Sequence, residues 1–185
     1  MKKTVFLDRD GTINKDNHYV YRIEDFEFLD GAVEGMRALC EAGYQLVIVT
    51  NQSGIARGYY SESDFHRLND WMCSELCRQG VIITKVYYCP HLHDAPVEKY
   101  AIECCCRKPQ PGMFLKAIEE LSVDTAHSFV IGDKLRDLAI CESTDIRGIL
   151  ISDVMQSAEK WVAADNLKTA SDYIINTENK ESSSG

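Results

Sequence analysis

The sequence predicts an α/β fold in which helices cover both faces of a mainly parallel, doubly wound sheet of Rossmann type. Short apolar segments alternate along the chain with segments whose apolar residues recur at helical spacing. The segment Gln45–Thr50 is a continuous apolar run, which is typical of a strand buried on both faces. The 185 residues suffice for one domain with a proper core, and no long insertion is available to form a large cap domain.

In the first half of the chain, apolar segments predict three strands, and helical spacing predicts two helices between them. Both helices have end signals. Gly43 follows the first helix, as glycine often does, and Ser61 with Asp64 can cap the start of the second. In chain order these elements are the strand Thr4–Leu7, the helix Gly31–Ala42, the strand Gln45–Thr50, the helix Glu62–Arg78 and the strand Lys85–Tyr88.

The second half of the chain continues the alternation with shorter elements. In chain order we expect the helix Met113–Leu121, the strand Ser128–Ile131, the helix Lys134–Glu142, the strand Gly148–Ile151, the helix Ser157–Ala164 and the short strand Tyr173–Ile175. The last residues are polar and end in Ser-Ser-Ser-Gly. We therefore expect one domain over residues 1–176 and a disordered tail over 177–185.

Polar residues follow three of the predicted strands, at the edge where parallel α/β sheets bind ligands. Asp8 and Asp10 come directly after the first strand, Thr50 ends the second, and Asp133 follows the fourth. Two carboxylates beside a buried strand are costly unless a cation neutralises them, and hard oxygen ligands favour Mg²⁺. A carboxylate can also attack phosphorus to form an aspartyl-phosphate. The alternative is an ordinary turn rich in Asp and Gly.

The segment Asp-Arg-Asp-Gly-Thr at residues 8–12 resembles the first motif of the haloacid dehalogenase superfamily of phosphatases. Thr50 and Lys108 match its second and third motifs, and Asp133 with Asp137 matches the fourth, all in the expected order. Longer segments, such as Thr-Asn-Gln-Ser-Gly-Ile-Ala-Arg-Gly from Thr50, are similar to the D-glycero-D-manno-heptose 1,7-bisphosphate phosphatases. The histidinol-phosphate phosphatases are the chief alternative within the superfamily.

The resemblance implies a role for each residue at this edge. Asp8 is the expected nucleophile and Asp10 the expected general acid and base, while Thr50 and Lys108 bind the transferring phosphoryl group. Mg²⁺ is expected between Asp8, Asp133 and the backbone carbonyl of Asp10. The implied substrate contacts are Asp16, Asn17, His18, Tyr19, Thr50, Asn51, Gln52, Ser53, Arg107, Lys108 and Lys134.

The resemblance also implies a particular reaction. The expected enzyme removes the 7-phosphate of a heptose 1,7-bisphosphate through an aspartyl-phosphate intermediate. This step belongs to the biosynthesis of ADP-heptose, a precursor of the lipopolysaccharide core. The same chemistry without the resemblance predicts only a Mg²⁺-dependent phosphatase that acts on a small phosphate ester.

A Cys-x-His pair in Cys-Pro-His from Cys89 and a Cys-x-Cys pair in Cys-Cys-Cys from Cys104 supply four soft metal ligands within one stretch of the chain. Cysteine and histidine suit tetrahedral zinc, although this spacing is tighter than that of a zinc finger. The alternative is a set of reduced, buried thiols with an incidental histidine. The resemblance favours zinc and assigns its ligands as Cys89, His91, Cys104 and Cys106.

The predicted zinc would be structural, because four protein ligands close its coordination sphere. It would staple a loop at about residues 89–107 that is otherwise entropically costly to hold in one shape. Alternation along an extended chain turns Cys105 away from its neighbours, and His93 is a weaker alternative ligand. Arg107 and Lys108 follow the last ligand directly, so a fixed loop would aim two cations at the site.

Composition excludes several other functions. Acidic residues outnumber basic ones by 29 to 20, and the resulting net charge of −9 argues against a broad nucleic-acid surface. No apolar run approaches the ~20 residues of a membrane helix, and the N-terminus lacks the apolar segment of a signal peptide. We therefore expect a cytoplasmic monomer whose partner is a small phosphorylated sugar, with no nucleic acid and no membrane.

Two hypotheses from other classes stay open. A non-catalytic phosphate-binding protein is disfavoured, because binding alone does not need both Asp8 and Asp10. A zinc-centred interaction module would need a basic or hydrophobic face near the metal and would not need Asp8. Arg57 lies between two glycines of the segment that begins at Thr50 and could meet a distal phosphate; the alternative is an ordinary surface residue.

Overall fold

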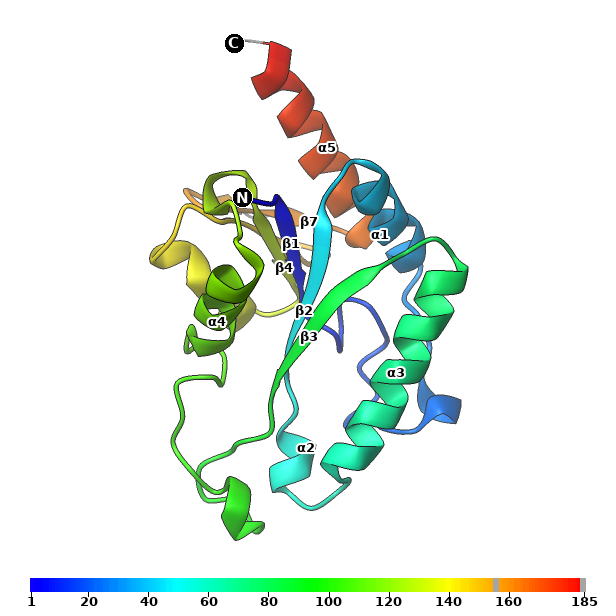
Figure 1. The fold of residues 1–185 in the computed structure, drawn as a ribbon, viewed down its shortest axis with the longest axis vertical. Coiled ribbons are helices and arrows are strands. Elements are labelled where there is room, and N and C mark those ends of the chain that lie inside the picture. The colour runs from blue at the N-terminus through cyan, green and yellow to red at the C-terminus, as the bar shows by residue number, and fades with distance from the viewer. Residues whose placement is uncertain (155–156, 184–185) are drawn as a thin grey trace.

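A computed structural model describes residues 1–154 and 157–183 of the chain (Figure 1). In this part of the chain the strands form one seven-stranded sheet in the order β3-β2-β1-β4-β5-β7-β6, and the β6–β7 pair alone is antiparallel. The predicted mainly parallel α/β sheet is thus confirmed. The strands are β1 (Thr4–Leu7), β2 (Gln45–Asn51), β3 (Ile83–Cys89), β4 (Phe129–Gly132), β5 (Arg147–Ile151), β6 (Ser157–Ala158) and β7 (Trp161–Ala164).

Helices cover both faces of this sheet, with α1, α3 and α5 on one face and α4 on the other (Figure 1). Side-chain alternation along β1 divides the core in the same way. Val5 and Leu7 share one core cluster with Met36 of α1, whereas Phe6 packs edge-on against Phe114 of α4. The helices are α1 (Ala32–Glu41), α2 (Ser53–Ala56), α3 (Glu62–Arg78), α4 (Gly112–Leu121) and α5 (Leu167–Ser183).

The first half of the chain follows the prediction, apart from the short helix α2. The capping box that predicts the start of α3 is formed: the Ser61 hydroxyl accepts from the Asp64 N–H, and the Asp64 carboxylate accepts from the Ser61 N–H. Across residues 1–154 and 157–183, no helix combines the length and the apolar content that crossing a bilayer demands.

The segment Ser157–Ala164, predicted as a helix, forms the strands β6 and β7 instead. β7 runs parallel to β5, pairing Gly148 with Trp161 and Ile151 with Ala164, and β6 turns back along β7. Pairing with the edge of β5 satisfies the backbone hydrogen bonds and buries Ala164, which outweighs a weak helical pattern.

The predicted strand Tyr173–Ile175 lies inside α5. Leu167, Ala170 and Ile174 are buried in the core, and their spacing of three and four residues is that of one helix face. The strand prediction was wrong because the three residues Tyr173–Ile175 are too few to reveal this spacing. The helix continues to Ser183, whereas the sequence predicts a disordered tail from residue 177.

The segment Lys134–Glu142, also predicted as a helix, forms two short 3₁₀ helices, Leu135–Asp137 and Ala139–Glu142. The buried Asp137 side chain accepts a hydrogen bond from the Lys134 N–H at 3.0 Å, which fixes a tight turn directly after β4. This turn brings Asp133 and Asp137 to the same edge of the sheet.

The topology places that edge beside the central strand. β1 pairs with β2 on one side and with β4 on the other, so the strand order reverses at β1. Such switch points leave a crevice beyond the carboxyl ends of the strands. Asp8 follows β1, Thr50 lies near the end of β2, and Asp133 follows β4.

Candidate active site and metal centre

A cluster of buried charges lies at the carboxyl end of β1. The carboxylates of Asp8, Asp133 and Asp137 offer oxygen atoms within 4.8 Å of one another. The Lys108 ammonium donates to Asp8 Oδ1 at 2.7 Å and to the Val49 carbonyl at 2.6 Å, and it lies 2.8 Å from Asp137 Oδ1. The carboxylates of Asp8 and Asp137 and the Lys108 ammonium are therefore buried together, whereas the Asp133 carboxylate is half-buried.

Burial dominates the electrostatics of this cluster. It raises the pKa of Asp8 to about 7, against the lowering effect of the Lys108 ammonium. Burial alone would lower the pKa of Lys108, but Asp8 and Asp137 outweigh it and raise that pKa above its usual value. Lys108 is thus a permanent cation, and the cluster keeps an excess of negative charge when Asp8 ionises.

This excess fits a hard divalent cation. The available ligands are carboxylate oxygens, which Mg²⁺ prefers, and they converge from two strand ends. The Asp133 carboxylate can lie this close to the backbone after β1 because residue 11 is glycine. The φ of Gly11 is +87°, and a Cβ at this position would lie 2.4 Å from Asp133 Oδ2. Asp137 also belongs to this cluster, although it was not among the predicted Mg²⁺ ligands. Its place in the fourth motif was the signal for it.

The raised pKa of Asp8 predicts how stability depends on pH. A carboxyl with a raised folded-state pKa stabilises the fold below its unfolded value near pH 4 and loses that contribution as pH rises towards 7. We therefore expect Asp8→Asn, which cannot ionise, to gain melting temperature relative to the native chain over this pH range. Thermal melts from pH 4 to pH 8 with a chelator present test this; a difference that does not change with pH would contradict it.

A cavity of about 310 Å³ lies over the charged cluster. It brings together nearly all of the predicted substrate contacts and adds seven residues that were not among them. The predicted residue outside it is Asn17, which lines a neighbouring cavity with Glu24 and Asp25. The lining residues are Asp8, Asp10, Asp16, His18, Tyr19, Thr50, Asn51, Gln52, Ser53, Arg57, Tyr60, Arg107, Lys108, Asp133, Lys134, Arg136 and Asp137.

Asn51 lines this cavity, but its amide is engaged with the backbone of the opposite loop. Its Nδ2 donates to the Lys108 carbonyl at 3.0 Å, and its Oδ1 accepts from the Lys108 N–H at 3.0 Å. This two-way contact ties the end of β2 to the residue that carries the buried cation. Asn51 therefore fixes Lys108, a function that the sequence offers no signal for, because the two residues are 57 positions apart.

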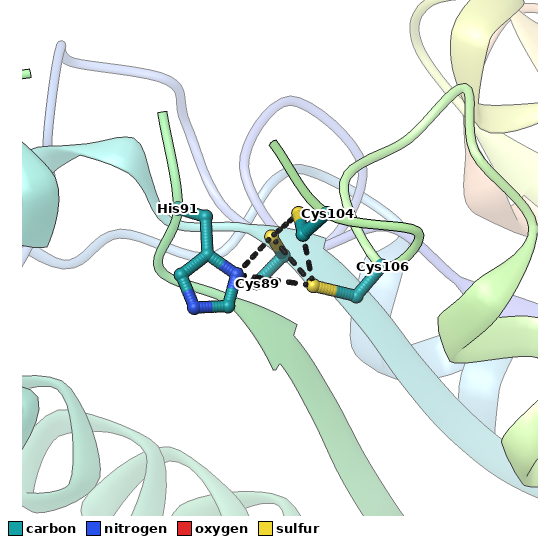
Figure 2. A group of neighbouring side chains, drawn as sticks. All are labelled: Cys89, His91, Cys104 and Cys106. Carbon is teal, nitrogen blue, oxygen red and sulfur yellow. Dashed lines mark hydrogen bonds between the residues drawn. The ribbon is translucent and has the colours of Figure 1, made fainter. Parts of the chain in front are cut away.

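The second cluster is formed by Cys89, His91, Cys104 and Cys106, whose ligand atoms point toward one another (Figure 2). The thiol sulfurs are 3.0–3.5 Å apart, and His91 Nδ1 lies 3.3 Å from Cys106 Sγ and 3.7 Å from Cys89 Sγ. A tetrahedron with Zn–S bonds of about 2.3 Å has edges of about 3.8 Å, so these residues can hold zinc with little movement.

The two neighbours of uncertain assignment lie outside the cluster. Cys105 is exposed, and His93 pairs with Asp94 at 2.7 Å.

A second set of contacts ties the same region to α3, since the hydroxyls of Tyr88 and Tyr100 donate to the Glu62 carboxylate at 2.9 and 2.5 Å. These contacts lower the pKa of Glu62, with the Tyr100 hydrogen bond contributing most.

Removing one residue of the cysteine and histidine cluster should loosen the loop that carries it. We expect Cys106→Ser to abolish binding of about one zinc per chain and to lower the melting temperature by ~5 °C or more, because the loop loses its cross-link. Elemental analysis and thermal melts measure both. Cys105→Ser is the matched control and should change neither; loss of zinc from that variant alone would show that the ligand set is wrong.

The fold and the charged cluster together define a hydrolase of the haloacid dehalogenase type, and the HAD-hydrolase-like family model matches residues 105–177. A HAD-like phosphatase structure from Mesorhizobium loti is similar, with a TM-score of 0.84 and 31% identity over 95% of this chain and 87% of that chain. The D-glycero-beta-D-manno-heptose-1,7-bisphosphate 7-phosphatase of Pasteurella multocida is 45% identical over 95% of this chain and 92% of its own length. The chain belongs to this family of phosphatases and is a phosphoric monoester hydrolase.

A third comparison concerns a structure with ligands. D,D-heptose 1,7-bisphosphate phosphatase from B. bronchiseptica, complexed with magnesium and phosphate, has a TM-score of 0.81 and 27% identity over 95% of this chain and 99% of that chain. The resemblance drawn from the motifs is therefore confirmed at the level of the family. The chain also covers nearly the full length of these relatives.

Proposed function

We propose that this phosphatase removes the 7-phosphate of D-glycero-D-manno-heptose 1,7-bisphosphate through an aspartyl-phosphate on Asp8, in ADP-heptose biosynthesis. The observation that carries the proposal is the buried group of Asp8, Lys108 and Asp137 at the floor of a polar cavity. An ionised carboxylate next to a fixed cation is suited to attack a phosphate and to hold the product of that attack. The family of the chain supports the choice of substrate.

Mg²⁺ is the proposed catalytic cofactor. Asp8, Asp133 and the backbone carbonyl of Asp10 would hold it, and the excess negative charge of the cluster favours it. When bound, Mg²⁺ supplies positive charge that offsets the repulsion between the nucleophile and the phosphate. Zinc, by contrast, would occupy the cysteine and histidine cluster with four protein ligands and would serve structure alone.

The first chemical step uses three side chains. A carboxylate oxygen of Asp8 forms a bond to phosphorus while the bond from phosphorus to the sugar oxygen breaks. Asp10 gives its proton to the departing sugar oxygen, which leaves as an alcohol. Lys108 provides fixed positive charge at the attacking carboxylate, 2.7 Å from Asp8 Oδ1.

The second step releases the phosphate. Asp10, now a carboxylate, accepts a proton from a water molecule as the water oxygen attacks phosphorus. The bond between phosphorus and Asp8 breaks, which restores the free carboxylate and yields inorganic phosphate. The Thr50 hydroxyl donates to a phosphoryl oxygen in both steps, so the transferring group keeps its orientation.

The charges around the cavity support a substrate with two phosphates. Arg57, Arg107, Lys134 and Arg136 line it in addition to Lys108. A phosphate far from Asp8 needs such cations, whereas the amine of histidinol phosphate would need carboxylates in their place. Asp16 is a lining carboxylate outside the cluster, and sugar hydroxyls can use it equally well.

The substrate assignment is tested by comparing kcat/KM for heptose 1,7-bisphosphate and for histidinol phosphate on one preparation. We expect a strong preference for the heptose bisphosphate, because its second phosphate meets the cations of the cavity. A preference for histidinol phosphate would overturn the assignment and would leave the phosphatase class standing.

Arg107→Ala should weaken binding of the second phosphate. A lost charge-assisted hydrogen bond costs ~1.5–3 kcal/mol, so we expect KM for the heptose bisphosphate to rise ~10- to 100-fold, and KM for a simple monophosphate to rise much less. Arg67→Ala is the matched control, since Arg67 is exposed on α3 and pairs with Asp64. Equal effects of Arg107→Ala on both substrates would place Arg107 at the reacting phosphate instead.

A further inference from the structure

The side chain of Gln52 is almost completely buried at the wall of the active site, with 2% of its surface exposed. Its Nε2 donates to Asp10 Oδ2 and to Thr50 Oγ1, both at 2.9 Å. Its Oε1 accepts from the Tyr60 hydroxyl at 2.6 Å and from Arg9 at 3.4 Å. A glutamine amide has two donors and two acceptor sites, so every one of them is used within the protein.

The direction of this amide is determined by Arg9. A guanidinium has donors only, so the carbonyl end of Gln52 must face Arg9 and the NH₂ end must face Asp10 and Thr50. Thr50 Oγ1 consequently accepts a hydrogen bond from the protein. Its own O–H is then left as a donor, which is what a phosphoryl oxygen requires.

Asp10 is held on its other sides as well. Arg9 contacts both of its oxygens at 2.9–3.3 Å, and Asn14 Nδ2 donates to Oδ1 at 3.0 Å. Arg9 is fully buried, donates to the Val20 carbonyl at 2.8 Å and lies over the Phe65 ring. The carboxylate plane of Asp10 is therefore set by rigid neighbours, and one amide links it to Thr50.

We propose that Gln52, locked by Tyr60 and Arg9, is a positioning residue that holds the proton donor Asp10 and the phosphoryl-binding Thr50 in one fixed relation. It does not contact the substrate with its side chain, because no polar atom of that side chain is left unpaired. This inference rests on the proposed function, in which Asp10 protonates the departing oxygen and Thr50 binds the phosphoryl group.

The test separates proton donation from the rest of catalysis by means of the leaving group. A sugar alkoxide must be protonated as it leaves, whereas 4-nitrophenolate leaves as an anion and needs little help from an acid. In single turnovers, which report the first step alone, we expect Gln52→Met to lower the maximal rate of leaving-group release ~10²-fold for heptose 1,7-bisphosphate and less than ~10-fold for 4-nitrophenyl phosphate. Both half-saturating concentrations should change by less than ~3-fold.

Two further variants sharpen the comparison. Tyr60→Phe removes the hydroxyl that holds Gln52 and should shift the ratio of the two single-turnover rates in the same direction by a smaller factor, which also covers the case of a Gln52 variant that fails to fold. Gln45→Met makes the same substitution at the far end of β2, where the amide donates to Thr4 Oγ1, and should leave the ratio unchanged.

Equal loss of the single-turnover rate on both esters in Gln52→Met and Tyr60→Phe would overturn the positioning role. A rise in the half-saturating concentration of the sugar ester at an unchanged maximal rate would do the same, since it would make Gln52 a substrate contact. A native enzyme that releases phosphate from neither ester would overturn the proposed function and, with it, this inference.

Discussion

Asp8→Asn is expected to lower turnover of the heptose bisphosphate by ~10⁴-fold or more while the fold persists. The amide has nearly the shape of the carboxyl but has no anionic oxygen to attack phosphorus, so the covalent route is closed. The buried Lys108 keeps its second partner Asp137 at 2.8 Å, and its charge therefore stays balanced in the variant. Phosphate release at saturating substrate measures the loss, and circular dichroism checks the fold.

The covalent intermediate gives a second, independent measurement. Native enzyme quenched in acid during turnover should carry one phosphoryl group on the peptide that contains Asp8, as read by mass spectrometry, and Asp8→Asn should carry none. Asp70→Asn is the control, because Asp70 is an exposed carboxyl on α3. Near-native turnover by Asp8→Asn would rule out the aspartyl-phosphate route.

The position of the candidate active site was predictable because it depends mainly on the order of the strands. Asp8, Thr50 and Asp133 each follow or end a strand, and a parallel sheet brings such residues to one edge regardless of loop detail. The convergence of Cys89, His91, Cys104 and Cys106 was predictable for a similar reason, since residues two apart on two short segments can meet wherever the loop folds back.

The functions of the two amides could not be predicted from the sequence. Asn51 and Gln52 stand in a motif that suggests substrate contacts, yet their side chains bind Lys108, Asp10 and Thr50. Which atoms an amide meets depends on partners brought close by the tertiary fold, and a local pattern carries no record of them. The helix predicted over Ser157–Ala164 was wrong for the same reason, because pairing of β7 with β5 outweighs the local preference for a helix.

Lys108 connects the loop of the cysteine and histidine cluster to the proposed nucleophile, Asp8. It lies two residues after Cys106. Its backbone N–H and carbonyl both hydrogen-bond to the Asn51 side chain, and its ammonium contacts the Asp8 carboxylate. The charge that we propose supports attack on phosphorus is thus held beside Asp8 by the segment that follows the cysteine and histidine cluster. A change at this one residue should therefore affect both stability and turnover.

Lys108→Met should lower both the stability of the fold and the rate of turnover. Removing the ammonium leaves Asp8 and Asp137 buried without their cation, a change that destabilises proteins by about 3–5 kcal/mol. Turnover should fall at least ~10³-fold, because the fixed charge beside the phosphoryl group is lost. Urea unfolding and phosphate release measure the two effects, with Lys116→Met on the exposed face of α4 as the control.

A double variant distinguishes charge imbalance from lost packing. Asp137→Asn added to Lys108→Met removes one of the two stranded carboxylates, so we expect it to recover part of the lost free energy of unfolding and none of the turnover. Lost packing would predict no recovery, because the second substitution restores no volume. Recovered stability without recovered activity would show that Lys108 neutralises the buried carboxylates in the fold and separately supplies the positive charge that the reaction needs at Asp8.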